Sequence, residues 1–283
     1  MRIRTGRIGD KSFLKWAGGK TRYAQTLAAL APSEFSTFWE PFMGSAAVFF
    51  ELAPDRAVLS DANEELVICF QQVARDPERV MALLDAMTNS REYFGRVRGR
   101  DPQTLTSAER AARVIYLNKT AFRGLWRVNR RGQYNVPYGA YDRPYYNRTT
   151  LLAAAAALAR PGVTVRHGDY GQALRDAEPG DWVYLDPPYV PLGGYSDFKR
   201  YTSSQFHAAD HSRLQSLMRE ASDRGVHLLL TNADKPEVRE LYDGFAMTTL
   251  ATRRDINLNA RERASADLIV TNYKEFRQQR LAV

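Results

Sequence analysis

The stretch Asp181-Trp-Val-Tyr-Leu-Asp-Pro-Pro-Tyr189 places four apolar residues before an acidic residue, two prolines and a tyrosine. A short continuous apolar run predicts a strand that is buried on both faces. Pro187 and Pro188 remove two backbone donors and fix two φ angles, so the strand is expected to end in a rigid turn. The Asp186 carboxylate and the Pro187 carbonyl can then accept from one donor group, such as an exocyclic amine, and Tyr189 can stack on the ring that carries it.

On each side of this stretch, the sequence alternates between strand and helix patterns. Short apolar runs predict further strands at Thr37–Glu40, Arg56–Asp61, Val163–His167, Val226–Thr231, Phe245–Ala251 and Ala266–Tyr273. Helical spacing of apolar residues predicts helices at Asn63–Ala74, Pro77–Met87, Ala108–Thr120 and Ser204–Arg224. Strands separated by helices predict an α/β fold with a doubly wound, mostly parallel sheet that is covered on both faces.

Acidic residues stand at the ends of three of these strands, at Glu40, Asp61 and Asp186. Ligands of open α/β sheets lie beyond the carboxyl ends of the strands, so these side chains are expected around one crevice. Asp61 follows the turn Glu40-Pro-Phe-Met-Gly44 by about 20 residues, a spacing typical of an acid that binds ribose hydroxyls. The turn lacks the G-x-G-x-x-G pattern, which favours a nucleoside-like cofactor without a pyrophosphate.

The N-terminal motif Phe13-Leu-Lys-Trp-Ala-Gly-Gly-Lys-Thr21 is similar in part to a phosphate-binding P-loop. A P-loop requires a glycine five positions before Gly19, where Leu14 stands, and a preceding buried strand, which the sequence does not predict. Nucleoside triphosphate binding of that type is therefore excluded. The two glycines instead let the backbone approach a ligand closely, with Trp16 and Lys20 on either side.

The 283 residues carry a net charge of +8, and this charge is concentrated in one segment. Between Arg91 and Arg148 there are 13 Lys+Arg and 4 Asp+Glu, together with many aromatic residues. The sequence Asn129-Arg-Arg-Gly132 between apolar and aromatic runs predicts a β-hairpin here. Basic side chains neutralise phosphates and aromatic rings stack on bases, so the segment indicates nucleic acid binding. A solvated basic face with its own small core is the alternative.

Composition and spacing exclude several kinds of protein. Cys69 is the single cysteine, which excludes an intramolecular disulfide and a thiolate-rich zinc site and favours a reducing compartment. His207 and His211 lack the H-E-x-x-H pattern, so no metal site is predicted. No apolar run reaches the roughly 20 residues of a membrane span, and none follows the basic residues 1–11 as a secretory signal would require. The prediction is a cytoplasmic protein.

Taken together, FLKWAGGK, EPFMGSAAVF, SDAN, a basic insertion with NVPYG, and DPPY resemble the Dam-type DNA adenine-N6 methyltransferases, the D12 class. The motifs follow the family's order from Phe13 to the sequence Thr271–Tyr273. The resemblance implies an S-adenosylmethionine-dependent methyltransferase fold, with residues 1–75 and 149–283 as the catalytic, cofactor-binding domain. Residues 76–148 are then an inserted helical and β-hairpin domain that recognises the DNA target.

The resemblance also implies the residues of the active site. The catalytic motif is Asp186, Pro187, Pro188 and Tyr189. The residues that bind S-adenosylmethionine are Trp16, Lys20, Phe42, Gly44, Asp61, Asp169, Tyr170 and Asp186. Within this set, Asp61 holds the ribose, and Asp169 and Tyr170 lie by the adenine of the cofactor. Ala46 stands where the family typically has a second glycine in the first turn.

DNA recognition is implied for one N-terminal lysine and for the segment after the helix at 108–120. The DNA-binding residues are Lys15, Lys119, Phe122, Arg123, Leu125, Arg127, Asn129, Asn135, Pro137 and Tyr141. Phe122 wedges into the duplex, and Leu125 and Arg127 read bases, the arginine on guanine. The predicted site is GATC. Because Arg123 replaces the asparagine that is usual beside the wedging aromatic, a related site such as GATATC stays open.

The implied reaction is direct methyl transfer from S-adenosylmethionine to adenine N6, with the adenine flipped out of the duplex. Asp186 and the Pro187 carbonyl accept the N6 hydrogens, and Tyr189 stacks on the base. The expected partner is double-stranded DNA, bound by a cytoplasmic, nucleoid-associated monomer without metal or membrane, and a companion restriction endonuclease is left open. Two alternatives remain: a catalytically inactive DNA-binding regulator of the same fold, and an RNA adenine or cytosine-N4 methyltransferase.

Overall fold

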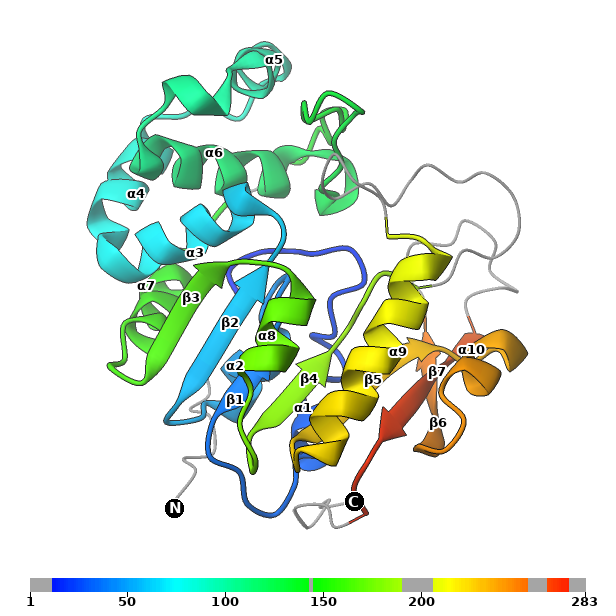
Figure 1. Cartoon of the computed structure of the whole chain (residues 1–283). Coiled ribbons are helices and arrows are strands. Elements are labelled where there is room, and N and C mark those ends of the chain that lie inside the picture. The colour runs from blue at the N-terminus through cyan, green and yellow to red at the C-terminus, as the bar shows by residue number, and fades with distance from the viewer. Residues whose placement is uncertain (1–11, 143–144, 190–205, 254–263, 275–283) are drawn as a thin grey trace.

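The computed structural model describes residues 12–142, 145–189, 206–253 and 264–274, with a seven-stranded sheet at its centre (Figure 1). The strands are β1 (Phe38–Glu40), β2 (Ala57–Asp61), β3 (Val163–His167), β4 (Trp182–Leu185), β5 (His227–Ala233), β6 (Ala246–Arg253) and β7 (Ala264–Thr271), in the spatial order β3-β2-β1-β4-β5-β7-β6. Strands β1 to β5 run parallel, and β7 is antiparallel to both β5 and β6. The strand order reverses between β1 and β4, the place where open α/β sheets bind ligands.

The sheet is buried on both faces because its central strands alternate between two hydrophobic clusters. Phe38, Trp182 and Tyr184 belong to one cluster, and Trp39 and Val183 belong to the other. Strands β1 and β4 are buried at every residue. A strand that is covered on both faces has a continuous apolar sequence, which is why the run before the two prolines predicts β4.

Helices cover both faces of the sheet, as the sequence predicts (Figure 1). One face carries α8 (Tyr170–Asp176), α9 (Ala208–Asp223) and α10 (Pro236–Leu241). The other carries α1 (Ala24–Ala29), α2 (Ala47–Leu52), α3 (Glu64–Arg75) and α7 (Arg148–Leu158). In the part of the chain that the structure describes, no helix has the length and apolar character to cross a membrane.

A further helical segment, between α3 and α7, packs against α3. It consists of α4 (Pro77–Asp85), α5 (Arg91–Gly99), the 3₁₀ turn η1 (Pro102–Thr104), α6 (Ser107–Thr120) and the 3₁₀ turn η2 (Phe122–Gly124). Phe70 of α3, Met81 of α4 and Ile115 of α6 are buried in the same hydrophobic cluster as the sheet residues Phe38 and Trp182. The segment therefore shares its core with the sheet.

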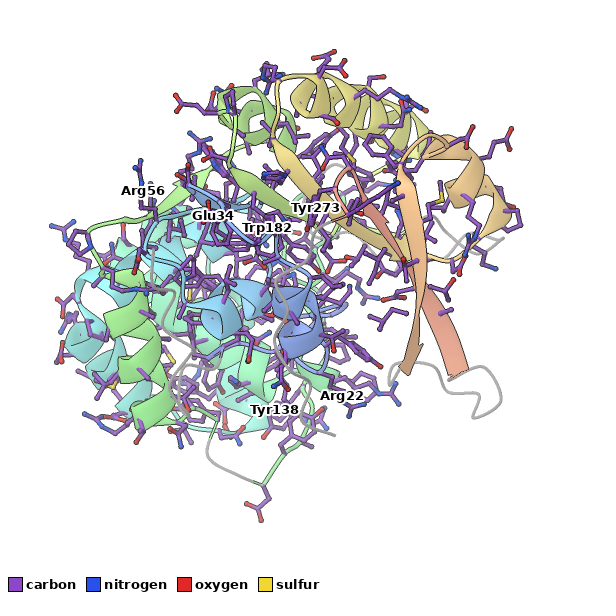
Figure 2. The ribbon with its side chains drawn as sticks, turned by 90° about the horizontal axis from the view of Figure 1, so that it is seen from below. Arg22, Glu34, Arg56, Tyr138, Trp182 and Tyr273 are labelled. Carbon is purple, nitrogen blue, oxygen red and sulfur yellow. The ribbon has the colours of Figure 1, made fainter. Side chains whose placement is uncertain are left out.

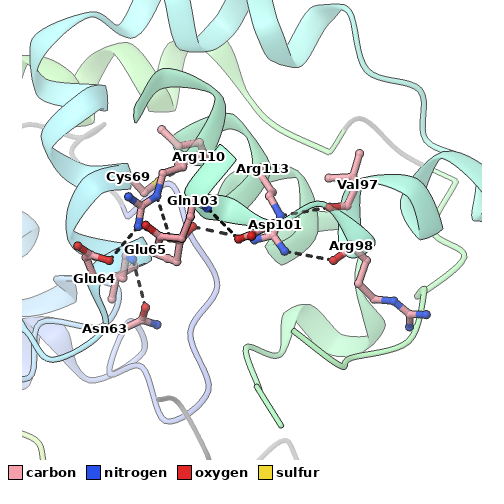
Figure 3. A network of polar contacts seen from close by, with 12 residues as sticks. Asn63, Glu64, Glu65, Cys69, Val97, Arg98, Asp101, Gln103, Arg110 and Arg113 are labelled. Carbon is pink, nitrogen blue, oxygen red and sulfur yellow. Dashed lines mark hydrogen bonds and ion pairs between the residues drawn. The ribbon is translucent and has the colours of Figure 1, made fainter. Parts of the chain in front are cut away.

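Two arginines of α6 fasten this segment (Figure 3). Arg110 forms ion pairs with Glu64 (2.9 Å) and with Glu65, both on α3. Arg113 is buried and donates to two carbonyls in the last turn of α5, at 3.1 and 3.2 Å. A cation at a helix C-terminus satisfies carbonyls that lack partners within the helix. Helices α3, α5 and α6 are thus joined by charged hydrogen bonds as well as by apolar contacts.

Local signals mark the starts of these helices. The Asn63 side chain caps α3, Asp76 caps α4, and Thr106 and Glu109 form a reciprocal capping box at α6. The three helices predicted in this part of the chain are confirmed, with ends within two residues of the observed ones.

The hairpin predicted around Asn129 is present as a turn without regular strands. It carries two isolated antiparallel bridges, Val128 with Tyr134 and Ala121 with Tyr138. The Asn129 carboxamide oxygen accepts from two backbone N–H groups of the turn, at 2.9 and 3.0 Å. Because a side chain binds donors that a strand ladder would use, the segment forms a side-chain-capped turn.

Every predicted strand is confirmed, again within two residues at each end. The helix predicted at Ser204–Arg224 corresponds to α9, although residues 204–205 and the N-terminal residues 1–11 lie outside the described residues. The sequence did not predict the antiparallel direction of β7, which depends on pairing between distant strands. It also did not predict α7 or the short helices α1, α5, α8 and α10.

The end of β7 is fastened at the edge of the sheet where β4 begins. The Tyr273 hydroxyl donates to the Leu30 carbonyl at 2.8 Å. Figure 2, which views the molecule from below, shows Tyr273 close to Trp182, the fully buried first residue of β4. This edge is opposite the one that carries the acidic strand ends.

Candidate active site

Three acidic residues lie at one edge of the sheet. Glu40 ends β1, Asp61 ends β2, and Asp186 follows β4. The three strands are parallel neighbours, with β1 in the middle, so their carboxyl ends meet at the same edge. The edge includes the point where the strand order reverses.

Asp186 is held from two directions. The Lys20 ammonium lies 2.6 and 2.8 Å from its two carboxylate oxygens, and the Thr231 hydroxyl of β5 donates to Oδ1 at 2.8 Å. Lys20 is 8% exposed and Thr231 is 1% exposed. Charge-assisted hydrogen bonds in such a buried setting hold the carboxylate in one orientation.

Opposing effects set the charge state of Asp186. Burial raises the pKa of the carboxyl, and the Lys20 ammonium and the Thr231 hydroxyl lower it. The Thr231 hydroxyl lies 3.2 Å from the Tyr184 hydroxyl in the core of the sheet. The Tyr184 and Thr231 hydroxyls therefore form a hydrogen-bonded chain that ends on the Asp186 carboxylate. This chain fixes the orientation of Asp186 as a hydrogen-bond acceptor at the end of β4.

Tyr189, after the two prolines, is anchored through its hydroxyl. This hydroxyl donates to the Asp267 carboxylate of β7 at 2.8 Å. Burial raises the pKa of the Tyr189 hydroxyl well above its usual range, so the group is a neutral donor. The Lys20 ammonium lies 4.9 Å from the centre of the ring. Asp186 and Tyr189 thus lie against the same cation.

The N-terminal motif forms a turn that brings Trp16 and Lys20 to this edge. The Gly19 N–H donates to the Trp16 carbonyl at 2.9 Å. The Trp16 ring lies on Gly44, where a Cβ atom would be only 2.8 Å from the ring, and Gly44 has a φ of +45°. Glycine is needed at Gly44 for both space and conformation. The N-terminal motif and the first turn of the sheet therefore meet.

Asp61 closes the turn that follows β1. Its two carboxylate oxygens accept from the N–H groups of Gly44 (3.1 Å) and Asn63 (2.9 Å). Burial raises the pKa of Asp61 to about 6, and these backbone N–H groups oppose the rise. A carboxylate offers about four acceptor positions, so Asp61 retains capacity for hydroxyl donors of a ligand.

Ala46 lies in the same turn in a left-handed conformation, with φ 51° and ψ 38°, just before α2. An L-residue in this region costs about 1–2 kcal/mol, which a glycine avoids. The second glycine that the resemblance leads one to expect would be the unstrained residue here. This chain keeps the turn with a strained alanine.

Glu40 is buried behind the turn, with 3% of its surface exposed. Its carboxyl accepts from the Phe49 N–H in α2 at 3.2 Å. Burial raises the pKa of Glu40 well above its usual range, the Phe49 N–H opposes the rise, and the charge of Asp186 adds to it. Glu40 therefore joins β1 to α2 and favours the neutral form beside Asp186.

Two of the predicted cofactor-binding residues, Phe42 and Tyr170, lie in an aromatic cluster, and a third, Asp169, is next to Tyr170 in the sequence. Phe42 stacks on Tyr170, with ring centroids 5.2 Å apart and planes at 22°, and Phe206 contacts both rings. Asp169 caps α8 and pairs with Arg213 at 2.8 Å. The Arg213 guanidinium lies 4.9 Å from the centre of the Tyr170 ring. Phe42, Asp169 and Tyr170 are thus joined in one group.

The predicted DNA-reading residues gather in the loop that follows α6. Phe122 is 45% exposed, although it is a large apolar side chain. Its N–H donates to the Pro137 carbonyl at 2.8 Å, and the Arg123 N–H donates to the Tyr141 hydroxyl at 2.6 Å. Arg123 has a φ of 56°, and its guanidinium lies 5.3 Å from the centre of the Phe122 ring. These four residues form one group around an exposed aromatic ring.

Arg127 is held by Asn135, whose carboxamide and backbone oxygens accept from the guanidinium at 2.7 and 3.3 Å. The Leu125 carbonyl accepts from the Tyr134 hydroxyl at 2.9 Å. Both predicted DNA-binding asparagines, Asn135 and Asn129, thus make side-chain contacts within the protein. Of the two predicted lysines, Lys119 is half-buried in the last turn of α6, and Lys15 is exposed.

Three further residues contact the site that the sequence did not identify. Thr231 binds Asp186, Asp267 binds Tyr189, and Asn118 of α6 binds the backbone of the N-terminal motif. The available signal is a polar residue within a buried apolar segment, because such a group almost always has a hydrogen-bond partner. That signal predicts a contact but does not name its partner.

The chain matches a known protein family over most of its length. The model of the D12 class N6 adenine-specific DNA methyltransferases matches residues 16–256. The chain belongs to this family. It is 35% identical over 279 residues to a type II methyltransferase of Lactococcus lactis subsp. cremoris, a match that covers 96% of this chain and 98% of the relative.

Other relatives are similar to the chain over comparable lengths. A type II methyltransferase of Methanocaldococcus jannaschii is 32% identical, with 93% of this chain and 99% of the relative covered. The DNA adenine methylase of Escherichia coli (strain K12) is 29% identical, with 94% and 96% covered.

Membership confirms the family resemblance and the S-adenosylmethionine-dependent methyltransferase fold that the sequence indicated. The chain is an adenine-specific DNA methyltransferase, and the alternatives of an inactive regulator and of an RNA or cytosine-N4 enzyme are set aside. Among the described residues, no group of three or more His, Cys, Asp and Glu side chains is arranged to hold a metal ion.

Proposed function

We propose that this enzyme uses S-adenosylmethionine to methylate N6 of adenine within GATC, and that the adenine is flipped out of the DNA duplex for the reaction. The observation that carries the proposal is the Asp186-Pro-Pro-Tyr189 turn. It combines a half-buried, aligned carboxylate with an anchored aromatic ring at the end of β4. An adenine inside the duplex cannot reach such a group, and extrusion costs a few kcal/mol.

The N6 amine is a weak nucleophile because its lone pair is delocalised into the ring. Hydrogen bonds from N6–H to Asp186 and to the Pro187 carbonyl favour its rehybridisation and stabilise the positive charge that develops on nitrogen. Lys20 binds both oxygens of Asp186 and Thr231 binds Oδ1, and a carboxylate offers about four acceptor positions, so Asp186 retains capacity for the incoming amine. Lys20 also favours the ionised carboxylate that the amine needs.

The residues around the first turn fit a nucleoside cofactor. Gly44 carries no Cβ, so Trp16 packs directly on its backbone, and Asp61 keeps acceptor capacity for ribose hydroxyls. The stacked pair Phe42 and Tyr170 offers an apolar edge for an adenine ring. When bound, S-adenosylmethionine supplies an electrophilic methyl group on a sulfonium. We assign its binding to these residues with Lys20, Asp169 and Asp186.

Two features support DNA recognition by residues 76–148 as a domain inserted between 1–75 and 149–283. The exposed Phe122 ring suits a wedge into the base stack. Arg127 is held by Asn135 in one orientation, as a residue that reads guanine through two hydrogen bonds requires. Lys15, Lys119, Arg123, Leu125, Asn129, Pro137 and Tyr141 complete the proposed DNA contacts. We propose a monomer on DNA in the cytoplasm.

The direct test is methylation of unmethylated plasmid by the purified protein and S-adenosylmethionine, with every N6-methyladenine mapped by modification-sensitive sequencing. Methylation confined to GATC is expected. Methylation at another motif would refute GATC and assign the change to Arg123. DNA binding without any methylation would refute the proposed chemistry.

The role of Asp186 is tested with Asp186→Ala. This variant is expected to lower turnover by at least about 10²-fold while duplex binding survives. Asp234→Ala is the matched control, because Asp234 is an ion-paired carboxylate bound to Arg239 on α10. Near-normal methylation by Asp186→Ala would contradict the assignment.

A further inference from the structure

Asn118 joins two segments that are more than one hundred positions apart in sequence. It is fully buried in the last turns of α6. Its carboxamide oxygen accepts from the Lys15 N–H at 2.9 Å. Its amide nitrogen donates to the Lys15 carbonyl and, at 3.1 Å, to the Gly124 carbonyl. One side chain therefore binds the N-terminal motif to the start of the loop that reads DNA.

Two other contacts join the same segments. A Cβ atom at Gly124, whose φ is +67°, would lie 3.1 Å from carbons of the Lys15 side chain. The ring of Trp16 stacks with that of Trp126, with centroids 5.9 Å apart and planes at 22°. The Lys15 side chain thus packs on the Gly124 backbone and the two tryptophan rings pack on each other, in addition to the hydrogen bonds of Asn118.

The other end of the motif contacts the catalytic edge. Lys20 binds both oxygens of Asp186, and Trp16 lies on Gly44. Residues 15–20 therefore form a strap, with Asn118 at one end and Asp186 at the other. The strap is thus a direct connection between the loop at Gly124 and Asp186.

We propose that Asn118 is a positioning residue that couples recognition of the DNA target to methyl transfer. The proposal rests on the proposed functions of Asp186 and of the loop at 122–127. When the loop binds its target sequence, the hydrogen bonds of Asn118 fix the position of the strap relative to the loop. The strap in turn positions Lys20 against Asp186. Loss of the hydrogen bonds that the Asn118 amide donates then lowers the methylation rate at the correct site. It also lowers the ratio of the methylation rate at the correct site to the rate at an altered site, while affinity for DNA is retained.

The chain offers a matched control in Asn272, after β7. Its carboxamide oxygen accepts from the Leu228 N–H at 2.8 Å, and its amide nitrogen donates to the Val226 carbonyl at 2.8 Å and to the Ser222 hydroxyl at 2.9 Å. The pattern of one accepted and two donated hydrogen bonds is the same as that of Asn118. Asn272 lies at the start of β5, at the edge of the sheet opposite the catalytic edge.

The experiment compares Asn118→Asp with Asn272→Asp, since aspartate keeps the shape and loses both donated hydrogen bonds. Single-turnover methylation is measured at saturating S-adenosylmethionine on a GATC duplex and on duplexes with one altered base pair. Asn118→Asp is expected to lower the methylation rate on the GATC duplex by at least about tenfold, as for a displaced catalytic group. The ratio of the rate on GATC to the rate on an altered duplex is expected to fall by a similar factor. The Kd for DNA is expected to stay within about twofold, because phosphate contacts supply much of the affinity. Asn272→Asp is expected to lose a similar amount of thermal stability and to keep both rates.

A result in which Asn118→Asp behaves as Asn272→Asp would overturn the coupling. So would a loss of rate matched by an equal loss of DNA affinity, which would reduce Asn118 to a support of the loop. If Asn118→Asp does not fold, Gly124→Ala displaces Lys15 from the other side and is expected to give the same separation of rate from affinity. The proposed function is judged separately, by the inactivity of Asp186→Ala.

Discussion

Thr231→Val removes a single hydroxyl from the catalytic edge and replaces it with a methyl group of the same shape. The change breaks the 2.8 Å hydrogen bond to Asp186 and leaves the Tyr184 hydroxyl, 3.2 Å away, without this acceptor. A hydrogen bond to a charged group contributes about 1.5–3 kcal/mol, so we expect the free energy of unfolding to fall by about 2–3 kcal/mol. For a chain of this size, that corresponds to a loss of about 3–5 °C in Tm.

The effect on catalysis follows from the contacts that remain. Lys20 still binds both oxygens of Asp186, so the carboxylate is kept but is less well oriented. A loss of about 1.4 kcal/mol of transition-state stabilisation lowers the single-turnover rate about tenfold. The Thr231 hydrogen bond also lowers the pKa of Asp186, so its removal raises that pKa. Because the proposed reaction uses the ionised carboxylate, the acidic limb of the rate profile should move to higher pH.

The assay is single-turnover methylation of a duplex from pH 5 to pH 8, with thermal unfolding measured on the same preparation. Thr271→Val is the control, because Thr271 is a buried threonine of β7 whose hydroxyl donates to the Tyr273 carbonyl at 3.1 Å. It should lose stability and keep both the rate and the acidic limb. A Thr231→Val enzyme with an unchanged rate and an unmoved acidic limb would refute the idea that Thr231 orients Asp186.

Four other substitutions test the site and the fold. Because burial raises the pKa of Asp61 to about 6, affinity for S-adenosylmethionine should fall by about tenfold per pH unit below that value, and Asp61→Asn should abolish this dependence in calorimetry. Gly44→Ala, which places a methyl group 2.8 Å from the Trp16 ring at positive φ, should weaken cofactor binding by about tenfold or more, and an unchanged Kd would contradict the proposed site. Ala46→Gly should change the free energy of unfolding by less than about 1 kcal/mol, since relief of left-handed strain offsets both the entropy of glycine and the loss of a buried methyl group; a loss of about 2 kcal/mol or more in chemical denaturation would show that the strain is absent. Arg113→Met should lower the free energy of unfolding by about 2–3 kcal/mol, because two carbonyls at the end of α5 lose their hydrogen-bond donor. The kcat per folded molecule should be unchanged.

The sequence predicted the strands well because a buried strand has a continuous apolar run within its own residues. Trp182–Leu185 is a continuous apolar run that stops at two prolines, so both the strand and its end are visible without a structure. The direction of β7 is set by its pairing with β5 and β6, and the residues of β7 alone do not indicate this direction. The seven residues of α8 are too few for a helical period to stand out, although Asp169 is an ordinary N-cap signal.

The candidate site divides in the same way. Residues in turns with unusual composition, such as Gly44 and Asp186, could be selected from the sequence because glycines and paired prolines have few other uses there. Thr231 and Asp267 could not, since a threonine or an aspartate within a strand is compatible with many partners. Their contacts depend on which strands lie side by side, and this is a property of the tertiary fold.

The shared core and the ion pairs of Arg110 bear on how target specificity can change by exchange between related enzymes. A transplant of the whole segment from α4 to α6 would set foreign side chains against Phe70 and against the Glu64 and Glu65 carboxylates, and any mismatch would strand a partly buried charge. An exchange confined to the loop between α6 and residue 141 leaves those contacts intact. On the proposed assignment of DNA reading to this loop, loop replacement is the route to new target sequences, whereas grafts of the complete segment require compensating changes in α3.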